Sequence, residues 1–281
     1  MSVRVITDST SDIPAGIAQD LGITVVPIYV RFGNTVYRDG LDITTAEFYQ
    51  MLLTSAVHPA TSQPTPEDFS RAYSEQAGEA DGIVSIHISS RISGTYNSAL
   101  LARSMQVNPS SIEVVDSRLN SGGLALVVME AARTAAAGAD LAAVLDATHR
   151  AMATTDMLGV FDTMKYLARS GRVSRAIAAA GGVLNVKPLL TFRDGEIVRA
   201  GMLRTVSRAM DRLYEFVASQ PGIRELALVH SAAPELAEEL RQRLGTVFPA
   251  KETLVLELGA GLGVHGGPGV LLAAVRRSGS D

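Results

Sequence analysis

Hydroxyl side chains gather directly after one apolar segment of this chain. Residues 83–88 have the apolar composition of a buried strand. The turn that follows contains Ser93, Gly94 and Thr95, and a helix is expected over residues 96–105. A strand that ends in such a turn brings together hydroxyls, free backbone N–H groups and the positive end of a helix dipole, a combination typical of anion sites. Ordinary helix capping by Ser93 or Thr95 explains the same residues equally well.

A second polar loop is held between prolines. Residues 59–64 read Pro-Ala-Thr-Ser-Gln-Pro, and Thr65 with Pro66 behind them predicts the start of a helix. That helix start does not explain the three polar residues before it. Prolines restrict the backbone, and a stiff polar loop is suited to fixing a polar group of a ligand. Thr61 and Ser62 are therefore candidate binding residues, with an ordinary surface loop as the alternative.

A glycine-rich segment, residues 259–269, surrounds His265. No strand–helix unit and no suitably spaced acidic residue follow this segment, which argues against a dinucleotide-binding loop. A histidine between glycines is open to whatever approaches it. His265 is thus either a turn residue or a ligand contact, and we favour the contact.

Basic residues recur at intervals of four, three and three at Lys165, Arg169, Arg172 and Arg175. This spacing places them on one face if the segment is helical. A solvated helix face is one interpretation of such a stripe. The other is a docking patch for a phosphate or for an acidic partner.

The composition excludes several classes of function. With 47% hydrophobic and 19% charged residues, the chain is expected to be globular with a substantial core. A net charge of −4 argues against broad nucleic-acid binding, and the lack of cysteine excludes thiolate chemistry and disulfides. We expect no secretory signal, no membrane-spanning segment and a cytoplasmic location. The GxxxxGK[ST], HExxH and GxSxG motifs are all missing from the sequence.

The order of elements predicts an α/β fold. Strands alternate with helices up to about residue 155, which favours a parallel sheet with helices on its faces. We place a domain boundary there, between an N-terminal α/β domain (1–155) and a smaller α/β domain (156–281) with a mixed sheet. Three local expectations are a single strand over residues 23–32, Asp12 as the cap of the first helix, and a short helix after residue 269.

Six motifs occur along the chain in a fixed order. They are Thr-Asp-Ser-Thr-Ser-Asp at 7–12, Thr-Ser-Gln-Pro at 61–64, Ser-Gly-Thr-Tyr at 93–96, Arg-Ser-Gly-Arg at 169–172, Lys-Pro at 187–188 and His-Gly-Gly-Pro-Gly at 265–269. Together they closely resemble the DegV family, which includes the fatty-acid-binding subunit of bacterial fatty acid kinase. The resemblance covers essentially the whole chain. It implies a two-domain fold with an acyl chain held in a tunnel at the domain junction.

The resemblance also implies roles for individual residues. The implied carboxyl-binding set is Thr61, Ser62, Ser93, Gly94 and His265. Arg169 and Arg172 match basic residues that serve partner docking or the phosphate. Two departures from the family pattern affect the geometry of the head-group site. Residues 259–264 lack the proline and the threonine that often precede the histidine, and Gly266 stands where a threonine is common.

In this reading the chain is a carrier and not an enzyme. The resemblance implies that it presents a long-chain fatty acid to a separate ATP-dependent fatty acid kinase. It then carries the acyl phosphate toward phospholipid synthesis, where an acyltransferase receives it. No metal and no cofactor other than the bound fatty acid are expected.

Two other functions compete with the carrier. A serine esterase or thioesterase would use Ser93 with His265, and it would need a third residue to orient the histidine and an oxyanion hole. A pure interaction module would use the face of Arg169 and Arg172. Turnover of an acyl ester that is lost in Ser93→Ala would favour the esterase, whereas bound lipid without turnover would favour the carrier. The interaction module predicts no lipid at all.

Overall fold

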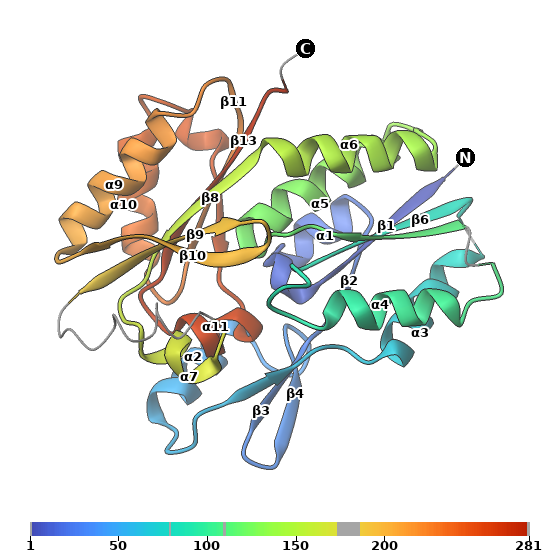
Figure 1. Cartoon of the computed structure of the whole chain (residues 1–281), viewed down its shortest axis with the longest axis horizontal. Coiled ribbons are helices and arrows are strands. Elements are labelled where there is room, and N and C mark those ends of the chain that lie inside the picture. Colours follow the sequence, from blue (N-terminus) through green and yellow to red (C-terminus); the bar gives the residue numbers. More distant parts are fainter. Residues whose placement is uncertain (1, 79, 109–110, 173–185, 280–281) are drawn as a thin grey trace.

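Three β-sheets organise the molecule (Figure 1). The computed structural model describes all residues except 1, 79, 109–110, 173–185 and 280–281. The first sheet is parallel, with the strand order β2 (Ile23–Val26), β1 (Val3–Asp8), β6 (Gly82–His87) and β7 (Ile112–Asp116). The α/β class predicted from the alternation of elements is confirmed.

Helices cover both faces of the parallel sheet. On one face, α3 (Pro66–Ala77) and α4 (Thr95–Ser104) bury Phe69, Tyr73 and Ala99 against the strands. On the other face lie α5 (Ser121–Ala136) and α6 (Leu141–Thr154). The short α1 (Ala15–Asp20) adds Ala18 to this second core. Both faces of the sheet are therefore apolar, as parallel sheets require.

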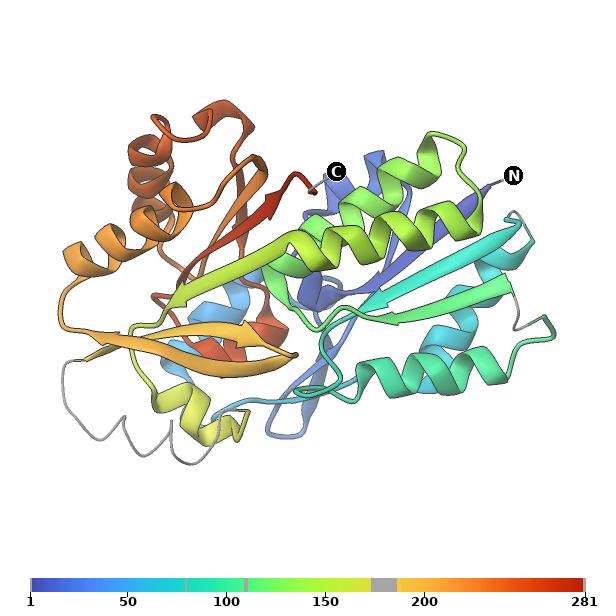
Figure 2. The ribbon, with the colours of Figure 1, turned by 45° about the horizontal axis from the view of Figure 1, so that its top comes forward.

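The second sheet is mixed and comes from the second half of the chain. Its order is β10 (Glu196–Leu203), β9 (Lys187–Arg193), β8 (Thr155–Val160), β13 (Leu271–Arg277), β11 (Ile223–His230) and β12 (Leu254–Glu257). Only β11 and β12 pair in parallel among these strands. Helices α9 (Val206–Ala218) and α10 (Pro234–Leu244) cover its outer face. Figure 2 shows the β9–β10 hairpin reaching from this sheet toward the parallel one.

A small antiparallel sheet carries the segment around Thr61. It consists of β4 (Thr35–Arg38), β3 (Tyr29–Phe32) and β5 (Ala60–Ser62). Helices α2 (Thr45–Thr54) and α11 (Ala260–Gly266) pack on it, and Phe32, Phe48 and Val264 lie in their shared core. The short α7 (Lys165–Ser170) lies against α11. The capping box at Thr44 and Glu47, expected from the sequence, starts α2.

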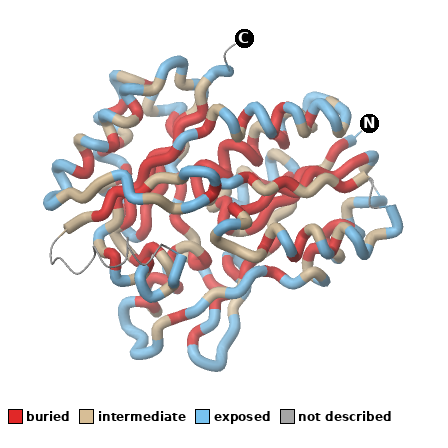
Figure 3. The backbone as a smooth tube through the Cα atoms, in the orientation of Figure 1, coloured by how far each residue is buried: buried red, intermediate tan, exposed pale blue. Residues whose placement is uncertain are grey.

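Helix α5 joins the two large sheets into one core. Figure 3 shows buried backbone running continuously through both. The same cluster contains Val84 and Ile86 of the parallel sheet, the apolar residues of α5, and Ala227 and Ala274 of the mixed sheet. The predicted domain boundary, between residues 155 and 156, falls after the first residue of β8 and stays a prediction. Within the described residues, no helix combines the length and the apolar character needed to cross a membrane.

Three local expectations are wrong. The strand over residues 23–32 is broken at Pro27, which has no N–H for a ladder, and its halves belong to different sheets. Asp12 does not cap α1, because it ends the 3₁₀ turn Ser9–Ser11 with a left-handed backbone. The segment after residue 269 is β13 and not a helix. All but one of its residues are buried, so its sequence lacks the alternation that distinguishes a half-buried strand from a helix.

We predict that Arg276 fastens α5 to the mixed sheet. Its side chain is only 5% exposed and reaches Glu130 of α5 at 2.9 Å and Glu225 of β11 at 2.5 Å. Replacing Arg276 with alanine leaves two partly buried carboxylates without this partner. The free energy of unfolding should fall by about 3 kcal/mol in urea denaturation. Arg277→Ala is the matched control, because the Arg277 pair with Asp156 is more exposed and should contribute about 1 kcal/mol or less. Equal losses for the two variants would contradict this assignment.

Candidate functional site

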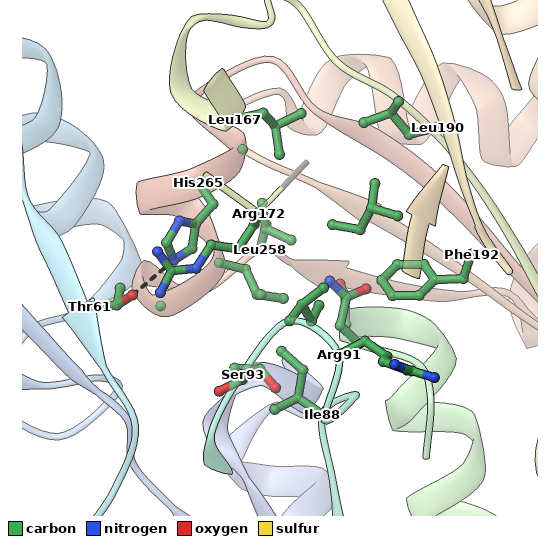
Figure 4. Close-up of a pocket in the computed structure, with 18 of the residues that line it drawn as sticks. Thr61, Ile88, Arg91, Ser93, Leu167, Arg172, Leu190, Phe192, Leu258 and His265 are labelled. Carbon is green, nitrogen blue, oxygen red and sulfur yellow. Dashed lines mark hydrogen bonds between the residues drawn. The ribbon is translucent and has the colours of Figure 1, made fainter. Parts of the chain in front are cut away.

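A cavity of about 490 Å³ lies where the three sheets meet (Figure 4). Every strand of the parallel sheet is followed by a residue that lines the cavity: Ile28 after β2, Thr10 after β1, Ile88 and residues 90–94 after β6, and Asn120 and Ser121 after β7. The cavity therefore lies at the carboxyl edge of this sheet, where α/β proteins usually bind ligands. The other walls come from the mixed sheet, α7, β5 and α11.

A hydrogen bond between two distant segments marks one end of the cavity. The Oγ1 of Thr61 lies 2.8 Å from Nε2 of His265, across 204 residues of sequence. Figure 4 shows the guanidinium of Arg172 on the same side of the cavity. Hydroxyl, imidazole and guanidinium are all able to donate hydrogen bonds to an anion. This end of the cavity is therefore suited to a carboxylate or a phosphate.

The small antiparallel sheet positions Thr61. Residue Thr61 lies opposite Val30 in the ladder of β3 and β5, which fixes its backbone. The next two residues, Ser62 and Gln63, also line the cavity. A Cβ on Gly94 would come within 2.7 Å of the Gln63 amide nitrogen. Glycine at position 94 thus allows the Thr61 loop and the Ser93 turn to approach closely.

The turn between β6 and α4 supplies Ser93 and Gly94 to the cavity wall. Gly94 is the N-cap position of α4 and offers no side chain for capping. The Ser93 hydroxyl instead lies 2.8 Å from the Thr95 hydroxyl and 3.3 Å from the Thr95 nitrogen. Ser89, earlier in the turn, donates to the carbonyl of Gly195 at the tip of the β9–β10 hairpin, 2.7 Å away. That bond holds the tip of the β9–β10 hairpin against the turn that follows β6, and Phe192 and Ile197 of the hairpin line the cavity.

Helix α11 supplies His265 from its last turn. Of the two alternatives left open for His265, the turn residue is excluded, because residues 260–266 are helical, and the side chain lines the cavity. Glycine is needed there for close packing: a Cβ on Gly263 would lie 2.5 Å from the Phe48 ring. Burial, together with the positive charges of Arg172 and His58, lowers the pKa of His265 to about 4. The imidazole is therefore neutral at pH 7, and its Nδ1 is buried without a hydrogen-bond partner.

The rest of the cavity is mostly apolar. Side chains from the mixed sheet and the adjoining segments contribute most of this surface: Ile88, Met157, Phe161, Leu167, Leu190, Phe192, Ile197, Leu258, Leu262, Val270 and Leu272. Figure 4 shows Leu190 and Phe192 on the side away from Thr61, and Leu258 and Ile88 between them and Thr61. The sequence does not distinguish them as lining residues, because apolar residues are abundant throughout the chain. Only the fold reveals which ones face the same space.

The structure brings most of the predicted site residues together. Thr61, Ser62, Ser93, Gly94, His265 and Arg172 line this one cavity. Arg169 is exposed on α7 and is not among the lining residues. Its charge acts instead on His58, whose pKa is lowered by burial and by Arg169 and Lys165. Arg175 lies outside the described residues.

The arrangement lacks the parts of a hydrolytic triad. Within the described chain, no hydrogen bond joins Ser93 to His265: the Ser93 hydroxyl bonds to Thr95, and Nε2 of His265 bonds to Thr61. No carboxylate orients His265, whose Nδ1 is unpartnered. Nucleophilic catalysis needs both contacts. Among the described residues, no three His, Asp or Glu side chains lie together in a way that could hold a metal ion.

We predict that His265 titrates near pH 4 in the folded protein. The unfolded chain takes up this proton near pH 6.5, so stability should fall as the pH drops from about 6.5 to 4. Arg172→Ala should raise the pKa of His265, because it removes a nearby positive charge. The measurement is an NMR titration of the histidine rings, with His265→Gln identifying the resonance. An ordinary pKa near 6.5 in the wild type would contradict the prediction.

Comparisons with known proteins agree on the family. A family model described as an uncharacterised protein of the DegV family matches residues 2–276. A DegV domain-containing protein of Streptomyces coelicolor is 38% identical over 274 residues, 96% of each chain. A DegV family protein from Thermus thermophilus, described as binding fatty acid, is 36% identical with a TM-score of 0.90, over 99% of this chain and all of that one.

A solved structure of lower sequence identity is described with a specific fatty acid. The protein from Eubacterium ventriosum, described as binding stearic acid, is 25% identical, with a TM-score of 0.88 over 98% of both chains. The family model and the relatives both span nearly the whole length of this chain, as the six motifs do. The chain belongs to the DegV family.

Proposed function

We propose that this chain binds a long-chain fatty acid, with the carboxyl group at Thr61 and His265 and the acyl chain in the apolar part of the cavity. The observation that carries the proposal is the division of one cavity into a donor-rich end and an apolar remainder. A carboxylate and an alkyl chain are the two halves of a fatty acid. The relatives described as binding fatty acid and stearic acid support this choice of ligand.

The donors at the polar end match the needs of a partly buried carboxylate. Such a group costs several kcal/mol to desolvate unless it receives hydrogen bonds. The Thr61 and Ser93 hydroxyls and the Ser62 and Gly94 backbone provide neutral donors, and Arg172 adds a positive charge nearby. Because burial keeps His265 neutral, the charge at the site comes from Arg172. The apolar wall then contributes about 0.8 kcal/mol for each methylene buried.

We further propose that the carboxyl group is presented to a separate ATP-dependent kinase in the cytoplasm. The sequence has no phosphate-binding GxxxxGK[ST] loop of its own. Arg172 lines the cavity and is exposed, so it is able to serve both the bound anion and an approaching phosphate donor. Arg169 and Lys165, exposed on α7, extend this basic surface for a partner. The product, an acyl phosphate, would pass to an acyltransferase of phospholipid synthesis.

Neither competing function has a specific observation in its favour. An esterase needs a histidine that is hydrogen-bonded to the serine and oriented by a third group, and His265 has neither contact. A pure interaction module has no use for an apolar cavity beside its basic residues. We therefore retain the carrier as the proposed function.

The test is mass spectrometry of the organic extract of the purified protein. We expect about one fatty acid per chain in the wild type and much less in a Thr61→Ala/Ser93→Ala double variant, because the carboxyl donors are lost. Ser55→Ala, at an exposed site outside the cavity, is the matched control and should keep its lipid. The proposal fails if the wild type carries no lipid and binds no added fatty acid. Hydrolysis of acyl esters that is lost in Ser93→Ala would favour the esterase instead.

A further inference from the structure

Two carboxylates hold the N-terminus of the helix that carries His265. Asp39 accepts hydrogen bonds from the backbone nitrogens of Ala260 and Gly261, both at 3.1 Å. Asp12 accepts one from the nitrogen of Gly259 at 2.9 Å. These N–H groups belong to the start of α11, where no helical partner exists for them. Carboxylates also interact favourably with the positive end of the helix dipole.

The carboxylates occupy room that the glycines leave free. Asp39 is 7% exposed, so it belongs to the interior and not to the surface. A Cβ on Gly261 would clash with the Ile28 side chain and lie 3.0 Å from Oδ2 of Asp39, and a Cβ on Gly259 would lie 3.1 Å from Oδ1 of Asp12. Glycine at these two positions therefore lets Ile28 and the two carboxylates approach the backbone of α11 closely.

The segment that anchors α11 is also the segment that supplies Thr61. Asp39 directly follows β4, and its backbone nitrogen donates to the carbonyl of Ile28 at 3.0 Å. The Ser9 hydroxyl donates to Asp39 at 2.9 Å and accepts from the nitrogen of Ile28 at 3.1 Å. Strand β3 starts at the next residue and pairs with β5, which contains Thr61. One small sheet thus fixes both partners of the bond between Thr61 and His265.

We propose that Asp39 is a positioning residue of the head-group site. Asp39 is not among the residues that line the cavity. By holding the first turn of a seven-residue helix, it sets where His265, one turn later, meets Thr61. Asp12 supports the same helix from the other side and joins it to Ser121 of the cavity wall, through a 2.6 Å bond. The role of Asp39 in ligand affinity rests on the proposed fatty-acid binding, whereas its effect on His265 does not.

The test compares Asp39→Ala and Asp39→Asn with a matched control. Asparagine keeps one acceptor oxygen for the helix, and alanine keeps none. Asp42→Ala removes a carboxylate three residues away that is exposed and pairs with Arg38 instead. The histidine ring resonances of the unliganded protein report on His265, and titration with octadecanoic acid reports on affinity. If Asp39→Ala does not fold, Ser9→Ala removes the hydroxyl that holds Asp39 in place.

We expect the His265 resonance of Asp39→Ala to shift and its pKa to move toward the ordinary value. The affinity for octadecanoic acid should fall about tenfold or more, with a smaller loss in Asp39→Asn and none in Asp42→Ala. An unchanged His265 resonance and unchanged affinity in Asp39→Ala, or in Ser9→Ala if the first does not fold, would overturn the inference. A wild type that binds no fatty acid would instead overturn the proposed function, while the effect on His265 would remain measurable.

Discussion

The burial of α5 between two sheets is the interaction on which the rest of the molecule depends. Its apolar residues pack on the parallel sheet and on the mixed sheet at once, so the two sheets share one core. Gly122 and Gly123 let the backbone of α5 approach Val229 and Met157 of the mixed sheet. The cavity opens at the start of this helix, beside Asn120 and Ser121. Its walls are therefore as fixed as the core itself, which favours a preformed ligand site.

The polar end of the cavity offers hydrogen-bond donors to an anion without a buried cation. An anion in a partly buried site needs donors, yet a buried cation opposite it would itself be costly to desolvate. The chain uses hydroxyls and a neutral imidazole inside and keeps its guanidinium at the exposed residue Arg172. Such a site can release its ligand or accept a more highly charged one without leaving a buried cation unpaired. That property suits the proposed role, in which the bound carboxylate would become an acyl phosphate.

Sequence reasoning predicted the elements whose signals are local. The capping motif at Thr44, the helix start at Thr65 and Pro66, the turn at Gly33 and the Asp-Gly turn at residues 194–195 are such signals, and each defines an element boundary in the structure. Sequence reasoning predicted the wrong secondary structure where tertiary contacts determine it. Residues 260–266 are rich in glycine and poor in helical propensity, yet they form a helix because carboxylates cap it and aromatic rings pack against it. Residues 271–277 are buried on both faces, which removes the periodicity that identifies a strand.

The candidate site was predictable only in part for the same reason. Thr61, Ser93 and His265 were identifiable because hydroxyls and a histidine lie in unusual loops. The resemblance to the DegV family then gave each of these residues an expected role in carboxyl binding. The apolar wall and Asp39 carry no such signal: leucines are common, and an aspartate after a strand usually belongs to a turn. Asp39 acts through the backbone of a helix more than 200 residues later in the chain. Contacts of that kind appear only when the fold is known.

The central claim is that one end of the cavity recognises a carboxylate and the remainder an alkyl chain. The most direct measurement compares the affinities of octadecanoic acid, its methyl ester and the corresponding alcohol by titration calorimetry. All three bury the same chain, and only the acid offers an anion to Thr61, Ser93 and Arg172. The account predicts that the acid binds at least about tenfold more tightly than either neutral analogue, as expected for hydrogen bonds to a charged group. Equal affinities for the three compounds would contradict it.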